Sequence, residues 1–242
     1  MIHEGKQLME RLQWQTIRRL FFAIVAIFFA LTVAACENMS EKTAASDVTT
    51  SVSSAEKEND KPLVIYFSRG INTDTSRDVD AVTGPSLKAD GDGFRSDEQV
   101  LAEWIAEETK GDLFAIRTAR KYPTGYDDIL EAGKQEKMED ARPILTSRLE
   151  NLPDYRTIYF VYPNWWSDLP MPVYSFFDEY DFSGKKIIAV VISGGGGFAG
   201  TVSYIQWLEP NAEVTEGIEI YKRDMDRARN QIVSWLRSEE EH

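Results

Sequence analysis

The chain is poor in the residues on which most side-chain catalysis depends. Of its 242 residues, one is cysteine (Cys36) and two are histidine (His3 and His242). The stretch 37–241 contains neither type, so it can form no disulfide, no cysteine nucleophile and no Ser-His-Asp triad. Nearly every zinc site is excluded as well. Any chemistry in this stretch must come from carboxylates or from a bound cofactor.

Basic residues are also outnumbered. The chain has 27 Lys and Arg against 40 Asp and Glu, which gives a formal net charge of −13 at pH 7. Such a surface repels nucleic acid and anionic lipid, and the sequence holds no basic stripe. We therefore expect no nucleic-acid partner.

The beginning of the chain indicates export. An apolar run over 20–35 is short for a spanning helix, which needs roughly 20 apolar residues, and suits a signal peptide. The preceding basic residues are Lys6, Arg11, Arg18 and Arg19. The run ends in Val33-Ala34-Ala35-Cys36, which resembles the bacterial lipobox. The resemblance implies a lipid on Cys36, which becomes the mature N-terminus; the alternative is an uncleaved signal anchor with an incidental cysteine.

The sequence thus divides into three parts. Residues 1–36 are expected to be a lipoprotein signal peptide, which implies an exported bacterial lipoprotein anchored to the outer face of the cell membrane. Residues 37–61 are rich in small and charged residues and predict a flexible tether. Residues 62–237 then form one α/β domain.

Strand-like and helix-like segments alternate through this domain, which predicts a parallel sheet covered by helices on both faces. The expected strands are 62–68, 112–117, 157–162, 186–193 and 212–220, and the expected helices are 97–110, 126–140, 172–180, 198–208 and 222–236. Ser96 and Gln99 predict a capping box at the first helix, and Gly111 its end. In such folds ligands bind at the carboxyl ends of the strands, near the point where the strand order reverses.

Two loops at that end have unusual composition. The loop after 157–162 contains Trp165 and Trp166, of which at least one is expected to be partly exposed and suited to stacking on a flat ring. The alternative is that both tryptophans seal the end of the sheet. The loop after 186–193 contains four glycines, Gly194 to Gly197, which let the backbone approach a ligand closely. Its alternative is a floppy connector.

The loop after the first strand has hydroxyls and a glycine that suit a phosphate cradle: Ser68, Gly70, Asn72 and Thr73. No helix follows at once, and residues 76–95 are expected to form a long, irregular polar insertion that is functional or mobile. Asp90 and Asp92 hint at a calcium loop, but the bidentate Glu at the required later position is lacking. A solvated acidic loop is the simpler interpretation.

Five motifs in order resemble the flavodoxin-like family over about residues 62–237. They are YFS at 66–68, YPNWW at 162–166, LPMPVY at 169–174, EYDFSGK at 179–185 and GGGGF at 194–198. The resemblance implies a three-layer α/β sandwich, with a five-stranded parallel sheet in the order 2-1-3-4-5, that binds FMN. It places the phosphate near Ser68, Gly70, Asn72, Thr73 and Ser96, and the flavin ring near Pro163, Asn164, Trp165, Trp166, Ser193, Gly194, Gly195, Gly196, Gly197 and Phe198.

The implied function is electron transfer, or reduction of a small acceptor such as a quinone, with a redox partner protein or that acceptor as partner. The flavin would carry the chemistry, so no residue is expected to be a general acid or base. The family's phosphate loop usually reads Ser-x-Thr/Ser-Gly-Asn-Thr, whereas this one is out of step. Arg69 and Arg95 could bind phosphate, and Asp97 and Glu98 would oppose it. The alternative is a flavin-free binding or interaction module at the membrane surface.

Overall fold

The structure is a computed structural model that describes residues 61–73, 87–90 and 93–240. The expected signal peptide with Cys36, nearly all of the expected tether, and Asp92 lie outside the described residues. In the described ranges, no helix combines the length and apolar character needed to cross a membrane.

The domain is built on a five-stranded parallel sheet. Its strands are β1 (Leu63–Phe67), β4 (Asp112–Ile116), β5 (Thr157–Pro163), β6 (Lys186–Ser193) and β7 (Glu213–Tyr221). They lie in the order β4-β1-β5-β6-β7, and each neighbouring pair is parallel. Numbered along the chain, this is the order 2-1-3-4-5, so the expected flavodoxin-like sandwich is confirmed.

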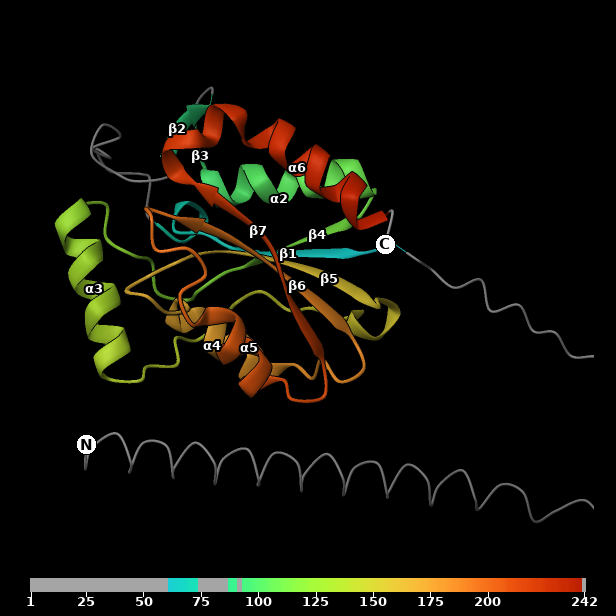
Figure 1. The fold of residues 1–242 in the computed structure, drawn as a ribbon. Helices are drawn as coiled ribbons and strands as arrows, with labels where there is room; N and C mark the ends of the chain where they lie inside the picture. The colour runs from blue at the N-terminus through green and yellow to red at the C-terminus, as the bar shows by residue number, and fades with distance from the viewer. Residues whose placement is uncertain (1–60, 74–86, 91–92, 241–242) are drawn as a thin grey trace, which may run out of the picture. The chain divides into compact units, whose positions relative to one another are not determined.

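Helices cover both faces of the sheet, as Figure 1 shows. The helices are α2 (Asp97–Thr109), α3 (Tyr126–Met138), α4 (Met171–Glu179), α5 (Thr201–Leu208) and α6 (Met225–Glu240). The green α2 and red α6 lie side by side on one face, and α4 and α5 lie on the other. Helix α3 stands beyond the edge formed by the carboxyl ends of the strands. The described residues also form three short 3-10 helices: η1 (Gly70–Asn72), η2 (Leu152–Asp154) and η3 (Lys222–Asp224).

The alternation of side chains along β1 explains the two cores. Ile65 and Phe67 pack in the cluster that includes Phe176 of α4, and Tyr66 packs in the cluster that includes Ile105 of α2. Successive side chains of a strand point to opposite faces, so one strand serves both layers. Each fully buried side chain contributes roughly 1.5–3 kcal/mol through the hydrophobic effect. The sheet is therefore a rigid platform for its loops.

The prediction of an irregular insertion over 76–95 is wrong for the residues in this range that the structure describes. Strands β2 (Leu87–Asp90) and β3 (Gly93–Ser96) form an antiparallel hairpin. The short strands carry polar, charged and small residues that are typical of loops, and this composition hid them.

Four helix ends also differ from expectation. Ser96 caps α2 by accepting a hydrogen bond from Gln99 N, but the Gln99 side chain donates to Glu103, so only half of the capping box forms. Lys110 rather than Gly111 takes the left-handed conformation at the helix end, with φ 54°. Helices α5 and α6 begin three residues later than expected, because turn and 3-10 backbone precede them.

Candidate functional site

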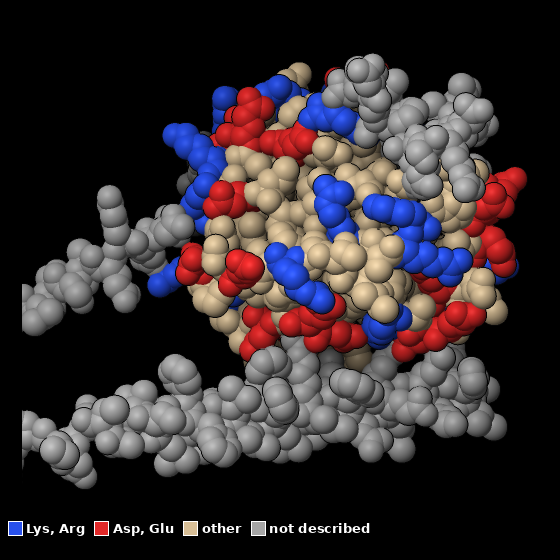
Figure 2. Space-filling view, turned by 180° about the vertical axis from the view of Figure 1, so that it is seen from behind, with Lys and Arg blue, Asp and Glu red and all other residues tan. Residues whose placement is uncertain are grey.

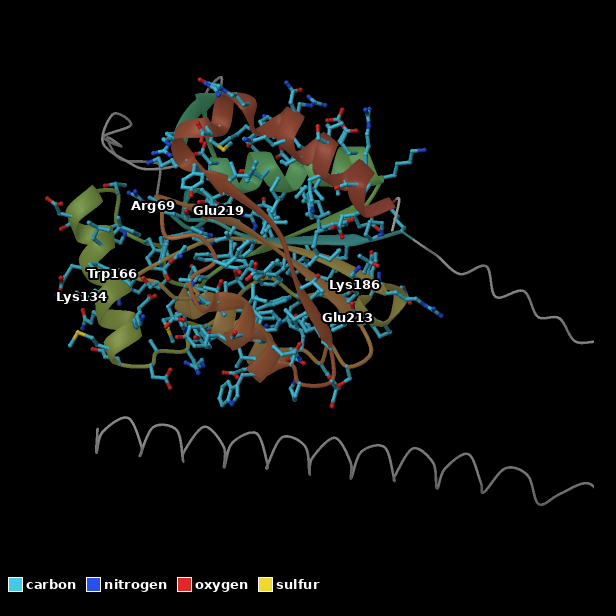
Figure 3. The ribbon with its side chains drawn as sticks, in the orientation of Figure 1. Arg69, Lys134, Trp166, Lys186, Glu213 and Glu219 are labelled. Carbon is cyan, nitrogen blue, oxygen red and sulfur yellow. The ribbon has the colours of Figure 1, made fainter. Side chains whose placement is uncertain are left out.

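A cavity of about 410 Å³ opens at the carboxyl ends of the strands, where the strand order reverses between β1 and β5. Figure 3 shows Arg69 and Glu219 at this end of the sheet, with Lys186 and Glu213 at the opposite end. The cavity is lined by Arg69, Glu98, Ile129, Leu130, Pro163, Asn164, Trp165, Trp166, Ile192, Ser193, Gly194 and Lys222. Parallel α/β folds bind their ligands in this position.

The Asn72 side chain fixes the loop after β1. Its Nδ2 donates to the carbonyl oxygens of Ser68 and Ile116, each at 2.9 Å, and its Oδ1 accepts from Thr118 N at 2.8 Å. Asn72 is fully buried, so these bonds join the end of β1 to the end of β4 without contact with solvent. Its amide group is occupied by the protein itself.

The other polar groups expected to bind phosphate are also engaged within the loop. Thr73 Oγ1 donates to Arg69 O at 3.0 Å, and Ser68 Oγ accepts from Ile71 N at 3.5 Å. Ser68, Gly70 and Thr73 are buried, and none of them lines the cavity. That they bind phosphate therefore stays a prediction, and their positions outside the cavity wall do not support it.

Arg69 is the residue of this loop that does line the cavity. Its side chain anchors to the backbone before α3, where Nη2 donates to Thr124 O at 2.5 Å. Arg69 is only 4% exposed, yet its Nε and Nη1 have no hydrogen-bond partner among the described residues. Buried donors are seldom left without a hydrogen-bond partner, because each one destabilises the folded protein by about 1–3 kcal/mol. The cost is larger when the donor is charged. Burial lowers the pKa of Arg69, and nearby Glu98 opposes that shift.

The two tryptophans lie on a tight turn after β5. Trp165 and Asp168 exchange backbone hydrogen bonds of 3.0 Å in both directions, and Trp166 and Ser167 between them both have φ 55°. Positive φ at both central positions is typical of a type I′ hairpin turn, and costs about 1–3 kcal/mol for each non-glycine residue. Lys137 of α3 holds this turn by donating to Trp166 O at 2.8 Å and pairing with Asp168 at 3.1 Å.

The indoles of the two tryptophans have different surroundings. Trp165 packs edge-on against Phe67 and Tyr122, with ring centroids 5.6 Å apart in both pairs. Trp166 is 48% exposed at the rim of the cavity, and its Nε1 donates to Leu130 O at 3.2 Å. The expectation of at least one exposed tryptophan is confirmed, and the alternative in which both seal the sheet is wrong for Trp166.

The glycine loop after β6 is organised by Ser193. The Ser193 hydroxyl donates to Glu219 Oε1 at 2.6 Å and accepts from the N–H groups of Gly195 and Gly197. Both glycines have positive φ, 130° and 60°, which side chains adopt at a cost. Asn164 Nδ2 donates to Gly197 O at 2.8 Å and joins this loop to the tryptophan loop. The alternative of a floppy connector does not fit this bonding.

The structure brings six of the fifteen expected site residues to the cavity. The residues that line the cavity are Pro163, Asn164, Trp165, Trp166, Ser193 and Gly194. Gly195, Gly196 and Gly197 lie further along the loop, Phe198 packs against the core, and Ser96 is buried as the cap of α2.

Sequence reasoning missed four lining residues: Ile129, Leu130, Ile192 and Lys222. The position of Lys222, immediately after the last strand, was an available signal. Ile129 and Leu130 carry no local signal, because tertiary packing alone places α3 beside the cavity.

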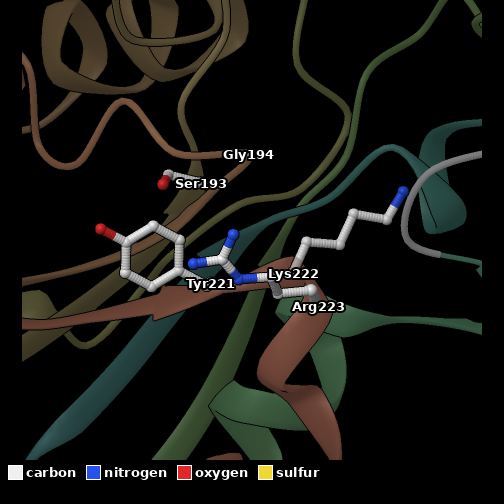
Figure 4. A pocket seen from close by; sticks show the side chains of 5 residues that line it. All are labelled: Ser193, Gly194, Tyr221, Lys222 and Arg223. Carbon is white, nitrogen blue, oxygen red and sulfur yellow. The ribbon is translucent and has the colours of Figure 1, made fainter.

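A second cavity of about 360 Å³ adjoins the first and shares Ser193, Gly194 and Lys222 with it. Figure 4 shows Arg223 turned toward Tyr221, with the guanidinium carbon 4.9 Å from the ring centroid. Lys222 extends the other way, toward the teal turn that contains η1. Within the part of the chain that the structure describes, no group of three or more His, Cys, Asp or Glu side chains could hold a metal ion.

Comparison with known proteins agrees with this architecture. A protein from Bacteroides uniformis ATCC 8492, provisionally named a flavoprotein, superposes with a TM-score of 0.56 at 25% identity, covering 74% of this chain and 98% of that one. A second, from Bacteroides eggerthii DSM 20697 and named in the same way, gives 0.51 at 21% identity over 72% and 98%. No curated protein sequence matches this chain. The family model described as Flavodoxin matches residues 95–238, which is more than half of the chain. The chain therefore belongs to the flavodoxin family.

Proposed function

We propose that this protein binds FMN in the cavity of about 410 Å³ and acts in electron transfer or in the reduction of a small acceptor such as a quinone. The observation that carries the proposal is Arg69, a buried cation that lines the cavity and whose Nε and Nη1 have no hydrogen-bond partner among the described residues. A guanidinium in this state suits the phosphate of a bound nucleotide, because charge-assisted hydrogen bonds are the strong ones.

The remaining residues of the cavity fit the other parts of FMN. Its volume falls in the range of roughly 300–1,000 Å³ that is typical of small-molecule sites. Trp166 offers a half-exposed indole face for a flat ring, and Gly194 adds backbone without a side chain. When bound, FMN would supply one- and two-electron redox chemistry, which these side chains lack.

The protein's own groups would position the cofactor and limit access of water. Ile129, Leu130 and Trp165 form an apolar part of the wall, and Asn164 holds the two ring-side loops together. Ser193 and Glu219 keep a polar, negatively charged contact behind the glycine loop. Negative charge near a flavin tunes its redox behaviour.

The family and the related structures support this proposal. Membership of the flavodoxin family and the likeness to the Bacteroides uniformis protein favour a flavin over other nucleotides. We propose a redox partner protein or a small molecule as the acceptor. Figure 2 shows a face on which basic side chains stand between acidic and uncharged ones rather than in a single stripe.

We also propose that the protein acts at the outer face of the bacterial cell membrane, held by a lipid on Cys36. The support is the sequence alone: the basic start, the apolar run and the small residues before Cys36. Mass spectrometry of the N-terminal peptide tests this, because a lipid-modified Cys36 at the mature terminus is expected. An unmodified Cys36 within an intact leader would overturn it.

The cofactor proposal is tested by visible absorption of the full-length protein, purified in detergent, incubated with FMN and freed of unbound ligand. Retained flavin bands near one per chain, with quenched tryptophan fluorescence, are expected. A folded protein that stays colourless and unquenched would instead favour the flavin-free binding module at the membrane surface.

A further inference from the structure

We propose that Arg69 and Lys222 act as a pair that selects a phosphorylated flavin over one without phosphate. This inference rests on the proposed function, and it assigns a binding role to Lys222, which lies outside the loop where phosphate was expected. The two side chains come from the ends of β1 and β7, with β5 and β6 between those strands in the sheet.

The geometry brings both cations to one cavity. Arg69 and Lys222 line it together, and they are the two basic residues in its described lining. Figure 4 shows the Lys222 side chain extended toward η1, the turn that directly follows Arg69, while its neighbour Arg223 lies against Tyr221. Lys222, which follows the edge strand β7, therefore shares the lining of one cavity with Arg69 of the loop after β1.

The charge environment agrees with a shared position. Burial lowers the pKa of Lys222, Asp97 and Glu98 oppose that shift, and the positive charge of Arg69 adds to it. Asp97 and Glu98, at the start of α2, are 3% and 2% exposed. Arg69, Asp97 and Glu98 are therefore all close enough to Lys222 to affect its pKa.

The neutral groups of the loop offer little alternative. The side chains of Ser68 and Thr73 bond within the loop, that of Asn72 bonds to Ser68 O and to Ile116 O of β4, and Ser96 accepts from Gln99 N as a helix cap. Arg69 and Lys222 supply the positive charge in the described lining of the cavity that could attract a phosphate. If cations rather than hydroxyls hold the phosphate, two properties of binding are expected: a preference for the phosphate ester, and an affinity that depends on salt.

The test compares dissociation constants for FMN and riboflavin, which share the ring and differ in the phosphate, by quenching of flavin fluorescence. The full-length protein in detergent is compared with Arg69→Gln and Lys222→Gln. The matched control is Arg223→Gln, the neighbouring cation, whose side chain is 79% exposed and lines only the second cavity.

The wild type is expected to prefer FMN over riboflavin by about tenfold or more, with an affinity for FMN that falls as salt rises. Each test variant should lose about tenfold in affinity for FMN while its affinity for riboflavin stays within about twofold. The control should match the wild type. Arg69→Lys, which keeps the charge, provides a second reading if Arg69→Gln unfolds, and should retain part of the preference.

Three results would overturn the pair. Equal affinity of the wild type for FMN and riboflavin would remove phosphate selection and leave the proposed flavin function standing. An FMN preference that survives in Lys222→Gln would show that Lys222 does not take part. Failure of the wild type to bind either flavin would remove the proposed function together with the pair.

Discussion

Ser193 at the end of β6 and Glu219 on β7 are joined by a hydrogen bond of 2.6 Å between the serine hydroxyl and Glu219 Oε1. The same hydroxyl accepts from two glycine N–H groups. One side chain therefore joins the glycine loop to β7 and contacts the nearby carboxylate of Glu219. The Ser193 hydroxyl is therefore a central anchor of the glycine loop, beside the bond from Asn164 to Gly197 O.

Ser193→Ala should loosen the glycine loop. The change removes the acceptor for the N–H groups of Gly195 and Gly197 and a donor to Glu219, which should cost about 2 kcal/mol of unfolding free energy. Hydrogen exchange should accelerate at those two amides, and flavin affinity should fall. Ser203→Ala, on the exposed surface of α5, is the control. Unchanged exchange at both glycines would contradict this role.

The two tryptophans should separate stability from binding. Trp165→Ala removes a ring packed against Phe67 and Tyr122 and should destabilise the protein by about 3–5 kcal/mol. Trp166→Ala removes a half-exposed indole and should cost less than about 1.5 kcal/mol, while weakening flavin binding and the associated quenching. Urea denaturation and flavin titration measure the two effects. If Trp166→Ala binds flavin as tightly as the wild type, the indole does not contact the ring.

Asn72→Ala should reduce stability strongly. The variant leaves the carbonyl oxygens of Ser68 and Ile116 and the N–H of Thr118 without their partner in a fully buried position. The expected loss is about 3 kcal/mol or more in unfolding free energy, measured in urea. Asn230→Ala, on the exposed side of α6, should change stability by less than about 0.5 kcal/mol. A small effect of Asn72→Ala would mean that this bonding is dispensable.

Glu98→Gln should tighten FMN binding. The substitution keeps the shape of the side chain and removes a negative charge from the lining of the cavity. Less repulsion of the phosphate should raise affinity for FMN by about 5–10-fold and leave riboflavin unchanged. Glu107→Gln, on the exposed part of the same helix, is the control. Weaker FMN binding in Glu98→Gln would show that this carboxylate supports the site instead of opposing phosphate.

Glu136→Gln should stabilise the protein at neutral pH. Burial raises the pKa of Glu136, although the hydrogen bond from Tyr122 partly opposes that shift. A carboxyl group whose pKa is raised by folding makes its full contribution to stability below its unfolded pKa of 4.5. That contribution is lost as the pH rises through the folded pKa. The variant should therefore become more stable than the wild type as the pH rises above about 4.5, and the two proteins should be equally stable in acid. Thermal unfolding across pH tests this, with Glu131→Gln as the exposed control; a pH-independent difference would contradict the linkage.

The fold was largely readable from the sequence because its central strands β1, β5 and β6 are buried on both faces. The run from Lys186 to Ser193 was predicted with the boundaries that β6 has, since eight residues rich in isoleucine and valine end directly at a glycine loop. The hairpin of β2 and β3 was not predicted, because its short strands carry charged and small residues that are typical of loops.

The site was harder to predict than the fold, for physical reasons. An amide such as that of Asn72 after a first strand suits a phosphate or a turn equally well, and only the positions of Ile116 and Thr118 decide between them. Lys222 belongs to the site because η3 replaces the first turn of the expected helix and leaves the residue at the end of β7. Local sequence patterns do not predict which strands that are far apart in the chain come into contact.

The hydrogen bonds of Asn72 have a consequence for the order of assembly. They join protein atoms only, so the turn after β1 can reach its final shape before any cofactor arrives. If the chain is exported as proposed, the apoprotein could fold outside the cytoplasm and collect flavin there in a separate step. Secretion would then be independent of the supply of cofactor inside the cell.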